Sequence, residues 1–415
     1  MRTMRQLECA RQATGSRIRV TACLFGLIGA YFLLASISHA CESDYLIWIP
    51  RSPDADPLYR FVKYSGEAPS GKAGYIDATG KVVIPLSIPY WGGNSGGEFH
   101  DGLLEIAVGD GVYVNTLGLE VIGRKFERGW TFSEGLAAAL DEHTQKWGYI
   151  NQKGAWAIQP QFASYPSGSV DSFQDGLAMV EVDGRYGYIG RSGKFAILPQ
   201  FPWADSFSDG MARVVVEGPC IYFLSLDEAP CGSFGIVPRG TKDTHSLSNC
   251  GYTYVGKSGI PISQQRFDLA KPFSEDLAPV KIAGAWGFID KQGRMAIAPQ
   301  FETAAPFADG LAKVSTDKRF GYIDHTGTLV IQPQYDYAED FAEGLAVVGS
   351  SDSGYWYIDY SGHQAIPRKF LLASPFFKGL AHVKLDGDRV PIEIEGGGTF
   401  AYINHAGTQV FTYKP

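Results

Sequence analysis

The chain has 415 residues, of which 45% are hydrophobic and 19% charged, a composition typical of folded proteins, and it is too long for one compact core. The first 40 residues carry a net charge of +4 while the whole chain carries −8, so the remainder is acidic. An acidic body without a stripe of Lys and Arg argues against nucleic acid as a partner, because phosphate binding needs clustered basic side chains.

The first expected element is an export signal over residues 1–40. Two arginines precede an apolar run at residues 20–35, and Ser38 and Ala40 then provide the small residues of a cleavage site. We therefore expect an exported protein, located in the periplasm, at the cell surface or outside the cell. The alternative is an uncleaved membrane anchor, because the apolar run approaches the ~18–20 residues that span a bilayer.

Four cysteines would remain after cleavage: Cys41, Cys220, Cys231 and Cys250. An even number in an oxidising compartment predicts two disulfides, in any of three pairings. Cys41 directly after the cleavage site also resembles a bacterial lipoprotein, but Ser38 stands where that family has Leu. Lipidation would moreover leave one other cysteine unpaired. Contact with a membrane is expected only through the N-terminal segment, if it is retained or lipidated.

Two short motifs alternate along the rest of the chain. The first, aromatic-Gly-aromatic-Ile followed by a glycine four residues later, is clearest at Trp147-Gly148, Tyr186-Gly187, Trp286-Gly287 and Phe320-Gly321. The second, Phe-Ser-Glu-Gly-Leu-Ala and its variants, contains Gly176, Gly210, Gly310 and Gly344. The last two of these glycines lie 34 residues apart, and the motifs together predict eight full units and a partial ninth at residues 400–411.

The spacing of the motifs divides the chain into segments. We expect a lead-in over residues 41–73, repeats 1–4 over residues 74–216, a cysteine-containing insert over residues 217–251, and repeats 5–9 over residues 252–415. The insert carries function, as loops on scaffolds often do, or it is a degenerate repeat held by a disulfide. The loop at residues 88–94 is a weaker candidate for function.

The aromatic-Gly-Tyr-Ile-Asp core and the Phe-Ser-Glu-Gly-Leu-Ala block together resemble the bacterial WG-repeat family over about residues 74–412. The stretch Val112–Asn115 departs from the family pattern, because it has lost both the leading aromatic residue and its glycine. The resemblance implies a repeat scaffold and implies no activity.

We predict an all-β chain in which each unit is a three-stranded antiparallel meander. Residues 147–151 and 156–158 are expected to form a hairpin, Pro160 to end its second strand, and residues 177–182 to form the third strand. Large apolar side chains occur on both faces of these strands, so each face must pack on a neighbouring unit. The fold class is therefore a tandem β-solenoid or propeller-like stack, as an open spiral or a closed ring.

An acidic residue precedes the glycine of the second motif in most units: Glu134, Asp175, Asp209, Asp309 and Glu343. Repetition argues against catalysis, because an active site needs one local set of groups in unequal environments. We predict that these side chains cap their own turns. The sequence shows no metal-ligand spacing, and we expect no catalytic residues, no metal and no cofactor.

Two enzyme motifs match by chance. Residues 251–258 fit the phosphate-loop pattern but coincide with a repeat hairpin, with Lys257 at its turn and no helix start after it. Residues 93–97 fit the nucleophile-elbow pattern around Ser95, yet they lie in a Gly-rich stretch without the required strand and helix.

The leading aromatic residues Trp147, Tyr186, Trp286 and Phe320 are expected to form the core of the stack. A sugar-stacking ladder is the alternative. His325 and His405 are expected at solvated hairpin turns.

The function predicted from these features is a non-enzymatic scaffold of the bacterial envelope that binds a protein or glycan partner. The more specific alternative is a cell-wall or polysaccharide-binding module with aromatic grooves between repeats. An enzyme would instead need a buried, unequal pair of ionisable groups in a pocket.

Overall fold

The computed structural model describes residues 57–64, 71–90, 98–106, 111–164, 169–216, 251–350, 352–387 and 398–415. All of them belong to one compact unit, Arg51–Cys220 with Ser246–Pro415. The expected export signal, all four cysteines of the expected disulfides, nearly all of the insert 217–251, and Ser95 lie outside the described residues. In the described part of the chain, no helix has the length and hydrophobicity needed to cross a bilayer.

The described residues form nine antiparallel sheets that follow one another along the chain. Sheet 1 contains β1 (Tyr59–Tyr64), β2 (Gly71–Ile76) and β3 (Val82–Tyr90). Sheet 2 contains β4 (Leu103–Glu105), β5 (Tyr113–Asn115) and β6 (Glu120–Ile122). Sheet 3 contains β7 (Arg128–Gly129), β8 (Leu136–Asp141), β9 (Lys146–Asn151) and β10 (Trp156–Ala163). Sheet 4 contains β11 (Leu177–Val182), β12 (Arg185–Gly190) and β13 (Phe195–Phe201). Sheet 5 contains β14 (Trp203–Ala204), β15 (Ala212–Val215) and β16 (Tyr252–Val255). Sheet 6 contains β17 (Leu269–Ala270), β18 (Leu277–Ile282), β19 (Ala285–Asp290) and β20 (Met295–Phe301). Sheet 7 contains β21 (Thr303–Ala308), β22 (Leu311–Thr316), β23 (Arg319–Ile323) and β24 (Leu329–Tyr335). Sheet 8 contains β25 (Tyr337–Ala338), β26 (Ala346–Ser350) and β27 (Gly354–Ile358). Sheet 9 contains β28 (Leu372–Ala373), β29 (Ala381–Gly387), β30 (Gly398–Ile403) and β31 (Gln409–Tyr413).

The all-β meander architecture is confirmed, but the sheets are offset from the sequence repeat. The predicted meander joined residues 147–182, whereas β10 does not pair with β11, and β11 pairs instead with β12 of the following motif. Sheets 2 to 9 therefore each combine the second motif of one sequence unit with the first motif of the next. A short additional strand, such as β7 or β17, precedes this meander in several sheets.

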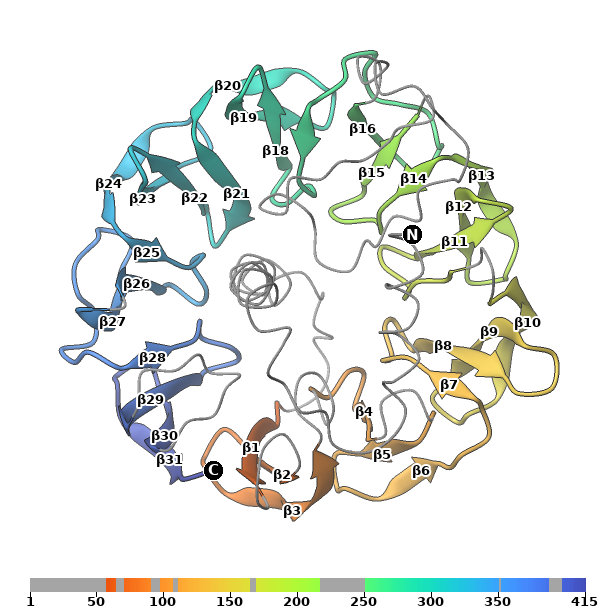
Figure 1. Ribbon diagram of the computed structural model, residues 1–415, viewed down its shortest axis with the longest axis horizontal. Helices are drawn as coiled ribbons and strands as arrows, with labels where there is room; N and C mark the ends of the chain where they lie inside the picture. The colour runs from red at the N-terminus through yellow and green to blue at the C-terminus, as the bar shows by residue number, and fades with distance from the viewer. Residues whose placement is uncertain are drawn as a thin grey trace, which may run out of the picture. The chain divides into compact units, whose positions relative to one another are not determined.

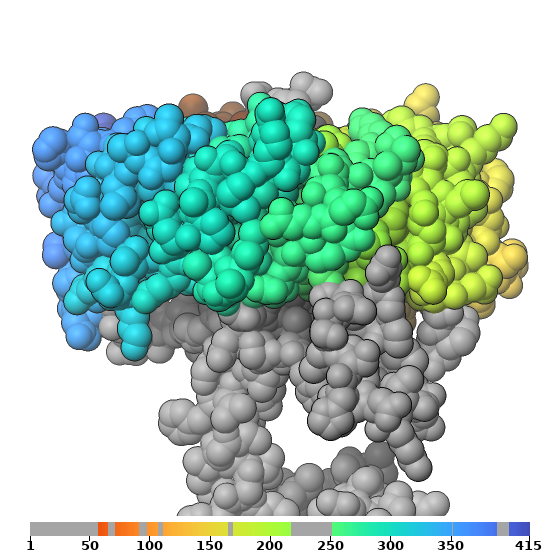
Figure 2. All heavy atoms as spheres, turned by 90° about the horizontal axis from the view of Figure 1, so that it is seen from above, coloured from red at the N-terminus to blue at the C-terminus, as the bar shows by residue number. Residues whose placement is uncertain are grey.

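The nine sheets close into a ring because each packs its faces on both neighbours (Figure 1). Nine apolar clusters join successive sheets, and the ninth joins sheet 9 back to sheet 1 through Tyr59, Phe61, Leu380 and Tyr402. Figure 2 shows the outer wall of the ring, where the side chains of sheets 5 to 8 meet without a break. This arrangement is propeller-like, and it decides between the open spiral and the closed ring that the sequence left open.

The closing seam between sheets 9 and 1 is made by side-chain packing. The hydroxyl of Tyr402 donates to the carbonyl oxygen of Arg60 at 2.6 Å, and the hydroxyl of Tyr59 donates to the carbonyl oxygen of Lys378 at 2.5 Å. The rings of Phe61 and Phe411 lie 5.0 Å apart. Among the described strands, none is exchanged between these two sheets.

The outer strand of the hairpin does not end at its proline, contrary to the prediction for Pro160. β10 continues through Pro160 to Ala163, and its pairing with β9 shifts register between Ile158 and Phe162. Proline is tolerated here because β10 is an outermost strand, whose outward N–H groups have no ladder partner. A proline at this position also protects the sheet edge from pairing with another chain.

The shifted outer strand explains the glycine of the first motif. A Cβ atom at Gly187 would lie 2.6 Å from the backbone nitrogen of Pro199 and 2.7 Å from the carbonyl oxygen of Ile197. The same close approach, at 2.5 Å to a strand carbonyl, occurs at Gly148, Gly287 and Gly321. The glycines of the second motif serve a different purpose, since their φ angles are positive: +80° at Gly176, +79° at Gly210, and +86° at Gly310 and Gly344.

Both ends of the repeat array extend further than the motifs indicate. Strand β1 lies within the expected lead-in, residues 41–73, and forms a sheet with β2 and β3. The ninth unit, predicted to be partial, is a full sheet of four strands. The degenerate stretch Val112–Asn115 still contains strand β5.

The insert interrupts a hairpin. Val215 of β15 pairs with Tyr252 of β16, so the residues on either side of segment 217–250 are direct neighbours in sheet 5. Residues 217–250 therefore do not separate two sheets, and the ring continues across them.

Candidate functional site

The tyrosine of the first motif links seven of the described sheets to the next sheet. Its side chain is buried, and its hydroxyl donates to a backbone carbonyl oxygen of the following sheet at 2.5–2.8 Å: Tyr113 to Trp130, Tyr149 to Asp171, Tyr188 to Asp205, Tyr254 to Lys271, Tyr322 to Glu339, Tyr357 to Ser374, and Tyr402 to Arg60. Burial raises the pKa of each of these phenols. In sheet 6, Phe288 occupies this position and packs on Phe307.

The acidic residue before the glycine links neighbouring sheets as well, which corrects the prediction that it caps its own turn. Its carboxylate accepts a hydrogen bond at 2.6–3.2 Å from a backbone N–H in the equivalent turn of the next sheet: Asp101 from Gly135, Glu134 from Gly176, Asp175 from Gly210, Asp209 from Asp276, Glu275 from Gly310, Asp309 from Gly344, and Glu343 from Gly379. All seven acidic residues have a positive φ between 50° and 55°. At the closing seam, Lys378 holds the equivalent position, also with a positive φ.

These turns and the outer hairpin turns lie on one side of the ring, which we call the turn face. In sheets 3 to 9, the second residue of the outer hairpin turn contacts the acidic residue of the preceding sheet. Gln152, Arg191 and Lys257 donate to backbone carbonyl oxygens of Asp101, Glu134 and Asp175, and the Lys291 ammonium pairs with Asp209 at 2.8 Å. Most seams therefore share the backbone contacts of the acidic turn, and the side chain at this hairpin position varies between them.

In sheets 7 to 9 the variable side chain is aromatic. His325 stacks on Phe307 with ring centroids 4.1 Å apart, Tyr360 on Phe341 at 4.9 Å, and His405 on Phe376 at 4.2 Å. We call His325, Tyr360 and His405 the aromatic triad. His325 and His405 lie at hairpin turns and are exposed, as expected, and each ring also stacks on a buried phenylalanine.

Each ring of the aromatic triad is also held by a carboxylate. The Nε2 atoms of His325 and His405 lie 3.1 and 3.2 Å from carboxylate oxygens of Glu275 and Glu343. Burial and the adjacent, hydrogen-bonded Asp309 raise the pKa of Tyr360.

The aromatic residues chosen from the sequence as a possible sugar ladder lie mostly in the core. Trp147 is 6% exposed and Trp286 is 7% exposed, while Tyr186 and Phe320 are half-buried. Trp130 packs edge-on against Trp147 at 5.7 Å, and the Lys271 ammonium lies 5.5 Å from the Trp286 ring. These contacts support the core interpretation of the first-motif aromatic residues.

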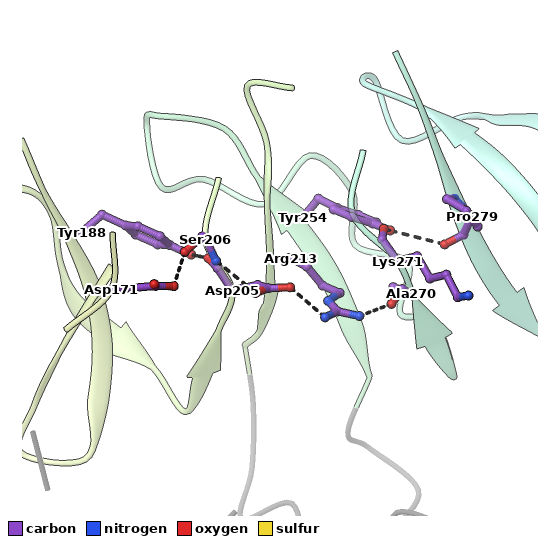
Figure 3. A network of polar contacts seen from close by, with 9 residues as sticks. All are labelled: Asp171, Tyr188, Asp205, Ser206, Arg213, Tyr254, Ala270, Lys271 and Pro279. Carbon is purple, nitrogen blue, oxygen red and sulfur yellow. Dashed lines mark hydrogen bonds and ion pairs between the residues drawn. The ribbon is translucent and has the colours of Figure 1, made fainter. Parts of the chain in front are cut away.

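A polar network crosses sheets 4 to 6 near the inner strands (Figure 3). The Asp171 carboxylate accepts hydrogen bonds from the Ser206 hydroxyl and from the Ser172 N–H. The Asp205 carboxylate forms an ion pair with the Arg213 guanidinium at 2.7 Å, and this guanidinium also donates to the carbonyl oxygen of Ala270.

The two carboxyl groups of this network differ in environment. Burial raises the pKa of Asp171, although hydrogen bonds from Ser206 and Ser172 oppose that shift. Asp205 lies beside Arg213, whose side chain is 12% exposed and lies 5.0 Å from the Trp203 ring. The Asp-Ser-Phe sequence occurs at both Asp171 and Asp205, a signal that sequence reasoning overlooked. Because each carboxylate has its own donors, the network is suited to holding the sheets together.

The residues of the phosphate-loop match behave as a repeat hairpin. Strand β16 precedes the turn, and the Lys257 ammonium donates to the Asp175 carbonyl oxygen at 2.5 Å. Among the described residues, no three His, Cys, Asp or Glu side chains gather as a metal site.

The family model for the WG containing repeat matches six segments: residues 147–186, 186–218, 252–284, 286–319, 320–349 and 357–387. No curated protein matches the chain. The crystal structure of a eukaryotic initiation factor matches with a TM-score of 0.54 at 10% identity, covering 86% of this chain and 96% of that one, which shows a shared fold. The C-terminal WD40 domain of Sif2 matches with a TM-score of 0.32 at 11% identity, covering 74% and 80% of the two chains. The repeated motifs, the nine-sheet ring built from them and the six matched segments together identify this chain as a member of the WG-repeat family.

Proposed function

We propose that this protein is a non-enzymatic scaffold, exported to the bacterial envelope, that binds a protein or glycan partner on the surface of its ring. The observation that carries the proposal is that some positions of the repeat are constant and make contacts between sheets, whereas an exposed position varies. The tyrosine, acidic and glycine positions shared by the units are used in contacts between sheets, and the exposed turn residue varies from unit to unit. Constant positions thus stabilise the ring, and variable positions are available for recognition.

The proposed location rests on the N-terminal sequence. A basic end, an apolar run at residues 20–35 and small residues before Cys41 are typical of export. Mass spectrometry of the mature N-terminus, together with cell fractionation, tests this part. An unprocessed chain found in the cytoplasm would overturn it.

Partner binding is tested by cross-linking in envelope extract. The full chain is compared with a variant in which a tight hairpin turn replaces the insert, which we call the hairpin variant. Because Val215 pairs with Tyr252, residues 217–250 can be replaced by an Asn-Gly turn without breaking sheet 5. We expect the full chain to capture a specific protein or glycan component. If the hairpin variant still captures the partner, recognition lies on the ring. If the hairpin variant no longer captures the partner, recognition lies in the insert. No enrichment over an unrelated acidic protein of the same size would refute the proposal.

A polysaccharide-binding module that uses grooves lined by the first-motif aromatic residues is not favoured. Trp147 and Trp286 have little exposed surface to offer a sugar. Their replacement by Ala is expected to lower the free energy of unfolding more than the affinity for any glycan.

A further inference from the structure

We propose that the turn face of sheets 7 to 9 binds a linear neutral glycan, whose sugar rings stack on His325, Tyr360 and His405. The inference rests on the proposed function and assigns it a ligand class and a site. It is carried by the three stacked rings, their exposure and the carboxylates beside them.

The aromatic triad presents flat, fixed surfaces to solvent. Each ring packs one face on a buried phenylalanine with interplanar angles of 16° to 24°, so the opposite face points away from the core. Exposure is 42% and 41% for the His325 and His405 side chains and 43% for Tyr360. A ring that is already immobilised loses little conformational entropy when a ligand stacks on it.

The chemistry around each ring matches a sugar. The apolar C–H face of a pyranose carries partial positive charge and is attracted to the negative face of an aromatic ring. Glu275, Asp309 and Glu343 lie beside the rings, and a carboxylate has about four lone-pair sites for hydroxyl donors. Two of these carboxylates, Glu275 and Glu343, keep 34% and 33% of their side-chain surface exposed.

The same carboxylates decide the charge of the ligand. They would repel uronic acids, sulfated sugars, phosphodiester polymers and acidic peptides at close range. An uncharged or N-acetylated sugar avoids this repulsion and still supplies hydroxyl and amide donors. We therefore assign a neutral glycan.

The repetition of the platforms suits a polymer. The three rings occupy equivalent positions in consecutive sheets, and packed sheets are separated by on the order of 10 Å. A linear chain can contact successive platforms, so weak individual contacts add up through effective concentration. The equivalent positions of sheets 3 to 6 hold Gln152, Arg191, Lys257 and Lys291, so the aromatic surface is confined to one sector.

A purely structural role is the competing explanation, because each ring covers a core phenylalanine. In sheet 4 that role is filled by Arg191, whose guanidinium lies 5.8 Å from the Phe173 ring. The experiment must therefore separate covering the core from stacking on a sugar.

Isothermal titration calorimetry of the full chain with N-acetylchitohexaose and with cellohexaose provides the test. The variant H325L/Y360L/H405L keeps an apolar cover on each phenylalanine but removes the flat rings. We expect it to bind at least about tenfold more weakly than the wild type, since the stacked contacts act together. Y360F keeps the ring and should stay within about twofold of the wild type.

The matched control is Q152A/R191A/K257A, which alters the equivalent turns of sheets 3 to 5 on the same face. It should bind like the wild type, and thermal melting should show all variants folded. Binding that survives in the leucine variant, or is lost equally in the control, would overturn the site. Absence of binding to both hexasaccharides by the wild type would overturn the ligand class. If the full chain still captures an envelope partner, the proposed function stands and only this inference fails.

Discussion

His382 at the closing seam should make the ring sensitive to acid. Its ring stacks on Tyr402 with centroids 4.9 Å apart and on Phe400 at 5.3 Å, and its Nε2 lies 3.0 Å from the Tyr413 hydroxyl. Burial lowers the pKa of His382 to about 4, and the charge of Arg60 across the seam contributes to the same shift. The folded protein therefore holds this side chain neutral over a range in which the unfolded chain is protonated.

The size of the expected loss of stability follows from the difference between the pKa of His382 in the folded protein and its pKa in the unfolded chain. An unperturbed histidine titrates near a pKa of about 6.5, and each pKa unit corresponds to about 1.4 kcal/mol. Because the unfolded state binds more protons between the two values, the contribution is fully present above about pH 6.5 and falls by about 3 kcal/mol on acidification to about pH 4. Stability should therefore decrease as the pH falls through this window.

Urea unfolding of the wild type and of H382Q measures the effect. Gln retains a polar partner for Tyr413 but does not titrate, and the carboxylates common to both proteins cancel in the comparison. The free energy of unfolding of the wild type, taken relative to that of H382Q, should fall by about 3 kcal/mol between about pH 7 and pH 4. A difference that stays constant with pH would refute the assignment of a neutral His382.

Three further substitutions test how the sheets are joined. Gly187→Ala should destabilise the fold by about 1–3 kcal/mol, because its Cβ would meet the backbone of β13, whereas Gly190→Ala on the same strand meets open space and should be nearly neutral in thermal unfolding. Tyr322→Phe leaves the Glu339 carbonyl oxygen without its buried donor and should cost about 1–3 kcal/mol in urea unfolding, and an unchanged midpoint would contradict the proposed link between sheets 7 and 8. Asp205→Ala should cost about 3–5 kcal/mol by leaving the Arg213 guanidinium buried without its carboxylate, and adding Arg213→Met should recover part of that loss; a double variant no better than the single would count against the ion pair as the cause.

Much of the local structure could be predicted from the sequence. The hairpin glycines, the aromatic and β-branched strands and the acidic-Gly turns are short-range signals, and they placed strands such as β9 and β12 correctly. Apolar residues on both strand faces correctly indicated that every sheet packs on two neighbours. The family resemblance followed from the same motifs.

The candidate site could be predicted only in part. The sequence placed His325 and His405 at hairpin turns, but their stacking on Phe307 and Phe376 and their pairing with carboxylates join residues of different motifs. The role of the acidic residues was likewise assigned to the wrong turn, because their partner lies about one repeat away in sequence.

What the sequence by itself determined is the repeating unit, since hydrophobic patterning and turn chemistry act over a few residues. The tertiary structure alone decided that nine sheets close into a ring, because closure depends on a small rotation between neighbouring sheets that accumulates around the array. It also decided which strands pair, placing β11 with β12 and leaving β10 as an outer strand. Only that closed arrangement brings Tyr402 of sheet 9 against Arg60 of sheet 1.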